Sequence, residues 1–104
     1  MRFQDLDVDQ DRLAAVCERH GVARLEVFGS LARGEAQAGS DIDLLATLMP
    51  GVRPGLDFVG LQQELEALFG RPADLLTRSA VERSPNKYFR RFALRRTGLL
   101  YERG

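Results

Sequence analysis

Apolar residues recur along the chain with two different periods, and the change of period marks the predicted elements. A spacing of three to four residues predicts helices, which fall at about residues 9–20, 56–69 and 84–96. Runs rich in strand-forming residues predict strands, which fall at about residues 22–28, 41–48 and 72–77, with 99–101 as a short edge strand. This alternation predicts a single α/β domain, residues 1–104, with helices packed on one sheet.

Capping residues set the expected ends of the helices. Asp5, Asp7 and Asp9 are candidate N-caps for the first helix, and Gly21 is a natural stop after it. Ser84 followed by Pro85 predicts the N-terminus of the last helix, and a capping-box sequence at residues 79–82 is an alternative start.

The composition is that of an ordinary globular protein. Of 104 residues, 44% are hydrophobic and 29% are charged. No apolar run approaches the roughly 18 residues of a membrane helix, and the acidic N-terminus lacks the apolar centre of a secretory signal. Cys17 is the only cysteine and is expected to pack in the core with His20 on the same helix, so a reducing, cytoplasmic setting is expected.

Charges of opposite sign are separated along the chain, although the formal net charge is zero. Residues 1–70 hold 6 arginines and 12 carboxylates, whereas residues 71–104 hold 9 Lys/Arg and 3 carboxylates. Tyr88, Phe89 and Phe92 lie among these cations, and the two phenylalanines are expected to tie the last helix to the core. The basic segment is either a solvated helix face or a surface for an anionic partner, for which a protein is favoured over RNA.

Two carboxylates lie two residues apart in a predicted strand. Asp41 and Asp43 project from one face because side chains alternate, whereas Ile42 and Leu44 face the other side. Two adjacent carboxylates in an apolar strand repel each other and lose hydration, which raises their pKa values. A divalent cation removes that conflict, and oxygen ligands without His or Cys favour Mg²⁺ or Mn²⁺.

Asp74 is a third carboxylate in an apolar strand. If strand 72–77 pairs beside strand 41–48, Asp74 lies about 5 Å across from the face of Asp41 and Asp43. Three converging carboxylates can hold two metal ions about 4 Å apart, an arrangement suited to in-line phosphoryl or nucleotidyl transfer.

Gly29 and Ser30 follow a predicted strand and form a candidate phosphate site. Glycine lets the backbone approach a phosphate closely, and Ser30 can open a short helical turn at residues 31–34 with its N–H groups directed at the phosphate. Arg33 is a further candidate phosphate ligand, and a structural role for it is equally open. Gly-Ser, ten residues and then Asp-x-Asp is far more specific than any of its parts.

The segment GSLARGEAQAGSDIDLL resembles the signature of minimal nucleotidyltransferases of the polymerase-β-like superfamily. Its fuller form, GSxARG followed by SDIDLL, resembles the stand-alone minimal nucleotidyltransferases encoded as antitoxins beside HEPN proteins. The resemblance implies a small mixed sheet flanked by helices, two Mg²⁺ ions and ATP as substrate. It also implies transfer of AMP to a tyrosine of the HEPN toxin, an RNase, which is thereby neutralised.

The resemblance also implies roles for individual residues. Gly29 and Ser30 would hold the triphosphate. The metal ligands would be Asp41, Asp43 and Asp74. Asp74 would in addition accept the proton of the attacking hydroxyl.

Three other functions remain open. A non-catalytic antitoxin would act by binding alone and would need neither Asp41 nor Asp43. A nucleotidyltransferase with a small-molecule acceptor, such as an aminoglycoside, usually needs a further domain to hold that acceptor. A nucleic-acid-binding module is disfavoured because the carboxylate face repels phosphate when no metal is bound.

Overall fold

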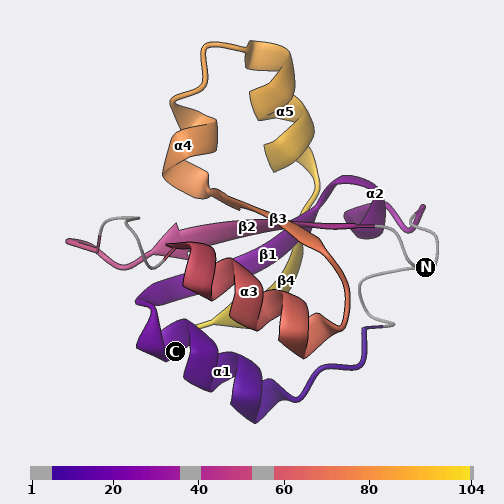
Figure 1. The fold of residues 1–104 in the computed structure, drawn as a ribbon. Coiled ribbons are helices and arrows are strands. Elements are labelled where there is room, and N and C mark those ends of the chain that lie inside the picture. Colours follow the sequence, from indigo (N-terminus) through magenta and orange to yellow (C-terminus); the bar gives the residue numbers. More distant parts are fainter. Residues whose placement is uncertain (1–5, 36–40, 53–57, 104) are drawn as a thin grey trace.

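The computed structural model describes residues 6–35, 41–52 and 58–103, which form a four-stranded sheet with helices on both faces (Figure 1). The elements in chain order are α1 (Gln10–Arg19), β1 (Val22–Phe28), α2 (Gly29–Ala32), β2 (Ile42–Leu48), α3 (Phe58–Phe69), β3 (Ala73–Thr77), α4 (Arg78–Glu82), α5 (Lys87–Arg95) and β4 (Gly98–Glu102). The predicted α/β fold class is confirmed. No helix in the described part of the chain is long and apolar enough to cross a membrane.

The sheet is mixed, with the strand order β3-β2-β1-β4. β1 runs antiparallel to both β2 and β4, whereas β2 and β3 are parallel and are joined through α3. Parallel neighbours need such a crossover connection, because the chain must return to the same end of the sheet. The order places the two carboxylate-bearing strands side by side.

The larger core lies between the sheet and the helices α1 and α3. Leu13, Cys17, Leu44 and Leu65 are fully buried in it, and each buried leucine contributes about 1.5–3 kcal/mol relative to an exposed one. Burial raises the pKa of the Cys17 thiol to about 12, so the thiol stays protonated at neutral pH. The prediction that Cys17 belongs to the core is confirmed.

A smaller core lies on the opposite face, under α4 and α5. It contains Phe28, Leu45, Val81 and Ala93. Because side chains alternate along β2, Leu45 shares this face with Asp43, whereas Leu44 points into the larger core. The cover of the second face ends short of Asp43.

The C-terminal helix differs from its prediction. One helix from Ser84 was expected, but the chain forms α4 and α5, and α5 is capped by Asn86, whose Oδ1 accepts hydrogen bonds from the backbone N–H groups of Tyr88 and Phe89 at 3.0 and 3.1 Å. The expected N-cap at Ser84 with Pro85 in the first turn is therefore wrong. Asn and Ser are equally good caps, so the local sequence does not choose between them.

Candidate functional site

Asp43 and Asp74 lie side by side on the open part of the sheet. They are paired in register on the parallel strands β2 and β3, and Asp43 is also opposite Phe28 on β1. Asp43 is half-buried and Asp74 is exposed. The predicted pairing of these two strands, with Asp74 beside Asp43, is confirmed.

The register of β3 is held by two side chains of α3. The amide of Gln62 donates a hydrogen bond to the backbone carbonyl of Ala73, and the carboxylate of Glu66 accepts one from the N–H of Ala73, both at 2.8 Å. β3 is an edge strand, so these bonds pair backbone groups that lack a strand partner. Because Ala73 precedes Asp74 directly, the two bonds position the carboxylate.

Gly29 lies directly against the carboxylate of Asp43. Its backbone has φ +70°, in the left-handed region, and any Cβ at this position would collide with Oδ2 of Asp43. Two independent restraints therefore require glycine here: the backbone conformation and the space beside the carboxylate. The turn that starts α2 begins at Gly29, two residues earlier than predicted.

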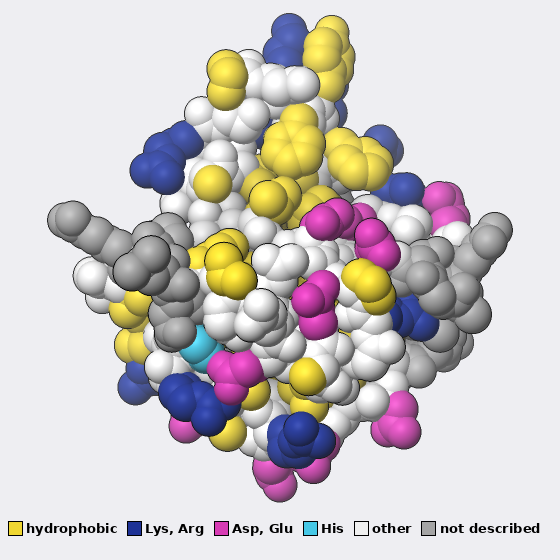
Figure 2. Space-filling model, in the orientation of Figure 1, with side chains coloured by type: hydrophobic (Ala, Val, Ile, Leu, Met, Phe, Trp, Pro, Cys, Tyr) yellow, Lys and Arg dark blue, Asp and Glu magenta, His cyan; other side chains and the backbone are white. Residues whose placement is uncertain are grey.

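The surroundings of Asp43 disfavour its charged form. Burial is the main cause that raises the pKa of the Asp43 carboxyl, followed by the negative charges of Asp74 and Asp41, and the guanidinium of Arg33 opposes them. Figure 2 shows acidic side chains gathered near the centre of this face, directly below a group of hydrophobic side chains. Repulsion of this kind is relieved by a cation.

Asp41 is exposed and comes just before β2. Within the described residues, no three Asp, Glu, His or Cys side chains are close enough together to enclose one metal ion as they stand. The convergence predicted for three carboxylates is thus found for Asp43 and Asp74, with Asp41 near enough to act on Asp43 through its charge. Two neighbouring carboxylates, of which Asp43 is disfavoured in its charged form, suit a hard divalent cation such as Mg²⁺.

Arg33 caps α2 and points across the site. Its guanidinium lies 4.9 Å from the ring centroid of Phe92 and pairs with Glu35 at 3.1 Å. The predicted phosphate ligand is therefore also part of a contact between α2 and α5. Ser30 lies in the first turn of α2, half-buried, and its carbonyl accepts a hydrogen bond from the N–H of Glu35 at 2.8 Å.

A cavity of about 400 Å³ opens above the carboxylates. Its lining contains the two carboxylates Asp43 and Asp74 together with Phe28, Phe89 and Phe92. The expectation that Phe92 ties α5 to the core is wrong, since 51% of its surface is exposed and Ala93 takes that position instead. Nothing in the local sequence separates these two residues, which are adjacent on one helix.

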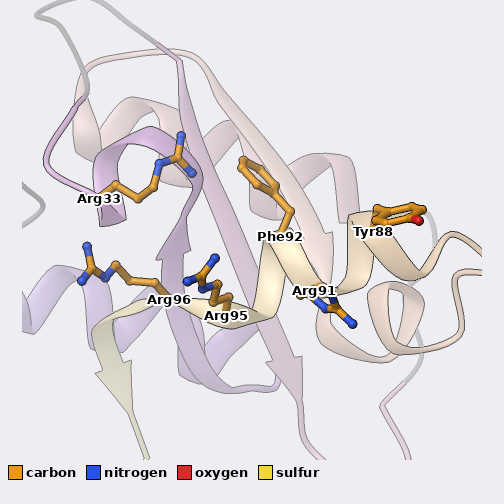
Figure 3. Close-up of a pocket in the computed structure, with 6 residues that line it drawn as sticks. All are labelled: Arg33, Tyr88, Arg91, Phe92, Arg95 and Arg96. Carbon is orange, nitrogen blue, oxygen red and sulfur yellow. The ribbon is translucent and has the colours of Figure 1, made fainter.

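A second and larger cavity, of about 640 Å³, lies on the other side of Phe92. Its lining combines arginines with aromatic rings: Arg33, Tyr88, Arg91, Phe92, Arg95 and Arg96. Figure 3 shows Arg33 and Phe92 directed toward one another, with Arg95 and Arg96 entering from the C-terminal end of α5. The site as a whole is therefore acidic on one side of Phe92 and basic on the other.

Known families and proteins include sequences similar to this chain. A family model described as "Nucleotidyltransferase domain" matches residues 12–100. "Putative protein adenylyltransferase MJ0435" of Methanocaldococcus jannaschii is 39% identical over 70 residues, which are 67% of this chain and 74% of that protein. Protein adenylyltransferase MntA of Thermococcus cleftensis is 42% identical over 67 residues, which are 62% of this chain and 65% of that protein.

Solved structures share the fold. A structure described as a minimal nucleotidyltransferase superposes with a TM-score of 0.71 at 35% identity and covers 96% of this chain and 97% of its own. The structure of a toxin–antitoxin with AMP-PNP gives a TM-score of 0.65 over 92% of this chain and 75% of its own. At 16% identity, the second match shows the fold alone.

Proposed function

Because the chain belongs to the nucleotidyltransferase domain family, we propose that it is an antitoxin that transfers AMP from ATP to a tyrosine hydroxyl of a partner toxin of the HEPN type. The observation that carries the proposal is the pairing in register of Asp43 with Asp74 in one cavity, with Gly29 packed on the Asp43 carboxylate. The names of two relatives, both protein adenylyltransferases, support a protein as the acceptor.

In this proposal the carboxylates bind Mg²⁺ and the turn after β1 binds the nucleotide. Asp41, Asp43 and Asp74 would hold two ions, which supply charge neutralisation for the triphosphate and a lower pKa for the attacking hydroxyl. The backbone at Gly29 and the hydroxyl of Ser30 would hold phosphate oxygens, with Arg33 beside them. The role of these residues is positioning and electrostatic stabilisation.

The reaction forms one bond and breaks one. The tyrosine oxygen attacks the α-phosphorus of ATP in line, and the bond from that phosphorus to the bridging oxygen breaks, so that pyrophosphate leaves. The proton of the hydroxyl passes to the Asp74 carboxylate, which is exposed and can release it to water. Phe28, Phe89 and Phe92 line the same cavity, and their rings would reduce the access of water to a nucleotide bound there.

Intact mass spectrometry of a co-expressed HEPN-type partner tests the proposal. We expect the partner to gain whole adenylyl units with the native chain and none with the Asp41→Ala/Asp43→Ala double variant. A stable complex without any gain in mass in both cases would contradict the proposal and favour an antitoxin that acts by binding alone. Transfer to a small molecule with no labelled partner would contradict the protein acceptor.

A further inference from the structure

The C-terminal helix carries most of a surface whose residues, apart from Arg33 and Phe92, the proposed chemistry does not use. This arginine–aromatic surface consists of the residues that line the larger cavity: Arg33, Tyr88, Arg91, Phe92, Arg95 and Arg96 (Figure 3). Four of these residues stand at positions i, i+3, i+4 and i+7 of α5 and therefore form one stripe along the helix: Tyr88, Arg91, Phe92 and Arg95. Tyr88 is 72% exposed and Phe92 51% exposed, so the stripe is turned outward.

Three of the four arginines of this surface have no counterion among the residues that the structure describes. Arg33 pairs with Glu35, but across residues 6–35, 41–52 and 58–103 no carboxylate lies within ion-pair distance of Arg91, Arg95 or Arg96. Exposed Arg, Tyr and Phe together are the side chains most enriched in protein interfaces, because they combine contact area with directed hydrogen bonds. An anionic partner complements this surface.

We propose that the arginine–aromatic surface docks the protein acceptor, through an acidic segment next to the hydroxyl that receives the nucleotidyl group. This inference rests on the proposed function and names the part of the chain that selects its partner. Phe92 lines both cavities, so a segment seated on the arginines continues directly to Asp43 and Asp74. The carboxylate cavity is the smaller of the two, so we expect the acceptor to make most of its contacts on the neighbouring arginine–aromatic surface.

The change of charge across Phe92 favours a protein over a nucleic acid. A bound chain has to be anionic over Arg91, Arg95 and Arg96 and uncharged where it meets Asp43 and Asp74. An acidic peptide with one hydroxyl side chain satisfies both conditions. A nucleic acid carries a phosphate at every residue and would be repelled at the carboxylate end.

Binding of a fluorescent peptide, without ATP, tests the docking by itself. The probe has about 15 residues, with one tyrosine between four glutamates, and its twin has glutamine in place of each glutamate. At about 50 mM salt we expect the acidic peptide to bind the Arg91→Gln/Arg95→Gln variant about tenfold more weakly than it binds the native chain. We also expect the native chain to bind the glutamine twin about tenfold more weakly than the acidic peptide. The matched control is Arg12→Gln/Arg83→Gln, which removes two exposed arginines that line neither cavity and should change binding less than about twofold.

Equal binding of the acidic peptide and its twin would overturn the docking surface, and so would equal effects of the two double variants. Tighter binding of a single-stranded RNA of the same length, abolished by Arg91→Gln/Arg95→Gln, would place a nucleic acid on these arginines and would overturn it as well. Displacement of the peptide by ATP alone would place a nucleotide there and would also contradict the proposal.

Adding ATP and Mg²⁺ to the same peptide separates this inference from the proposed function. Arg91→Gln/Arg95→Gln should raise the KM for the peptide by more than it raises the KM for ATP. Specific binding with no transfer of AMP to the tyrosine would contradict the proposed protein adenylylation and leave the docking surface standing. Transfer with a KM for the peptide that the variant does not change would contradict the docking surface alone.

Discussion

The two faces of strand β2 differ in how completely helices cover them, although their residues alternate in one short segment. Ile42, Leu44 and Ala46 point into the larger core, and all three are fully buried beneath α1 and α3. On the other face Leu45 is fully buried beneath α4 and α5, whereas Asp43 is left half-buried beside Asp74. One face is closed by helices along its length, and the other is closed only in part.

This difference shows how a small sheet supports a rigid site without a separate domain. The closed face supplies the burial that stabilises the strand, and the partly closed face uses the same strand to present a carboxylate. The cost of that carboxylate is the raised pKa of Asp43, which the fold tolerates because the opposite face is well packed. The two faces should therefore respond in opposite ways to substitution.

Substitution of Asp43 should have the largest effect on activity. We expect Asp43→Asn to lower AMP transfer by about 100-fold or more, because the amide is a poor ligand for a divalent cation, while the fold is retained. Incorporation of label from α-labelled ATP and the far-UV circular dichroism spectrum measure the two quantities. The exposed Glu82→Gln, which removes a carboxylate that lines neither cavity, serves as a control for loss of charge. Transfer by Asp43→Asn at the native rate would remove Asp43 from the proposed site.

The closed face should show the reverse pattern. Leu44→Ala leaves a cavity among fully buried side chains and should lower the free energy of unfolding by about 3 kcal/mol. Urea denaturation gives this value, with the exposed Val59→Ala on α3, expected within about 0.5 kcal/mol of the native chain, as the comparison. At low temperature, where the Leu44→Ala variant is still folded, its transfer activity should stay within a few-fold of the native activity. A loss of activity as large as that of Asp43→Asn would contradict the assignment of separate roles to the two faces of β2.

Substitution of two glycines distinguishes the effect of backbone strain from the effect of contact with the Asp43 carboxylate. Gly29 and Gly70 have nearly the same φ, +70° and +72°, but only a Cβ at Gly29 meets the carboxylate of Asp43, since nothing lies within 4 Å at Gly70. Gly70→Ala should cost about 1 kcal/mol of stability with transfer retained, whereas Gly29→Ala should cost about 2 kcal/mol and lower transfer at least tenfold. Equal transfer by the two variants would show that the contact between Gly29 and Asp43 has no part in the site.

The smallest effect is a dependence of stability on pH. The Asp43 pKa is raised in the folded state, so the fold binds its proton more tightly than the unfolded chain does, and stability falls as pH rises from the ordinary carboxyl value of 3.8 through the raised value. At neutral pH the ionised Asp43 therefore destabilises the fold. We expect Asp43→Asn to raise Tm by a small amount at pH 7 and by nothing below about pH 3.5, measured without divalent ions. A lower Tm of the variant at pH 7 would show that the carboxylate stabilises the fold.

The sequence predicted the parts of the site that depend on neighbouring residues. The alternation of Ile42, Asp43 and Leu44 turns Ile42 and Leu44 into the core and leaves Asp43 on the other face, because the period of a strand is two. Of the three aspartates that could cap α1, Asp9 does so, with hydrogen bonds to its side chain from the N–H groups of Asp11 and Arg12 at 3.0 and 3.2 Å. Both rules act within a few residues, so a local pattern is sufficient.

The C-terminal third was harder to predict because its possible arrangements differ little in local energy. Ser84 and Asn86 are both good caps, and the choice of Asn86 turns Phe89 and Ala93 toward Leu45 while leaving Phe92 on the surface. That choice is made by packing against a strand some forty residues earlier in the chain. It also creates the arginine–aromatic surface, which local periodicity alone assigned to the core at Phe92.

The amino-acid sequence by itself determined the strands, the helices α1 and α3, the alternation of faces along β2 and the glycine that follows β1. Only the tertiary structure decided that Asp74 lies in register with Asp43, that Gly29 touches the Asp43 carboxylate and that the helical cover stops beside them. The physical reason is that backbone hydrogen bonds between strands are the same for every residue type. Register is therefore restrained by contacts from outside the strand, here the bonds of Gln62 and Glu66 on α3 to Ala73, which the alternation within the strand does not encode.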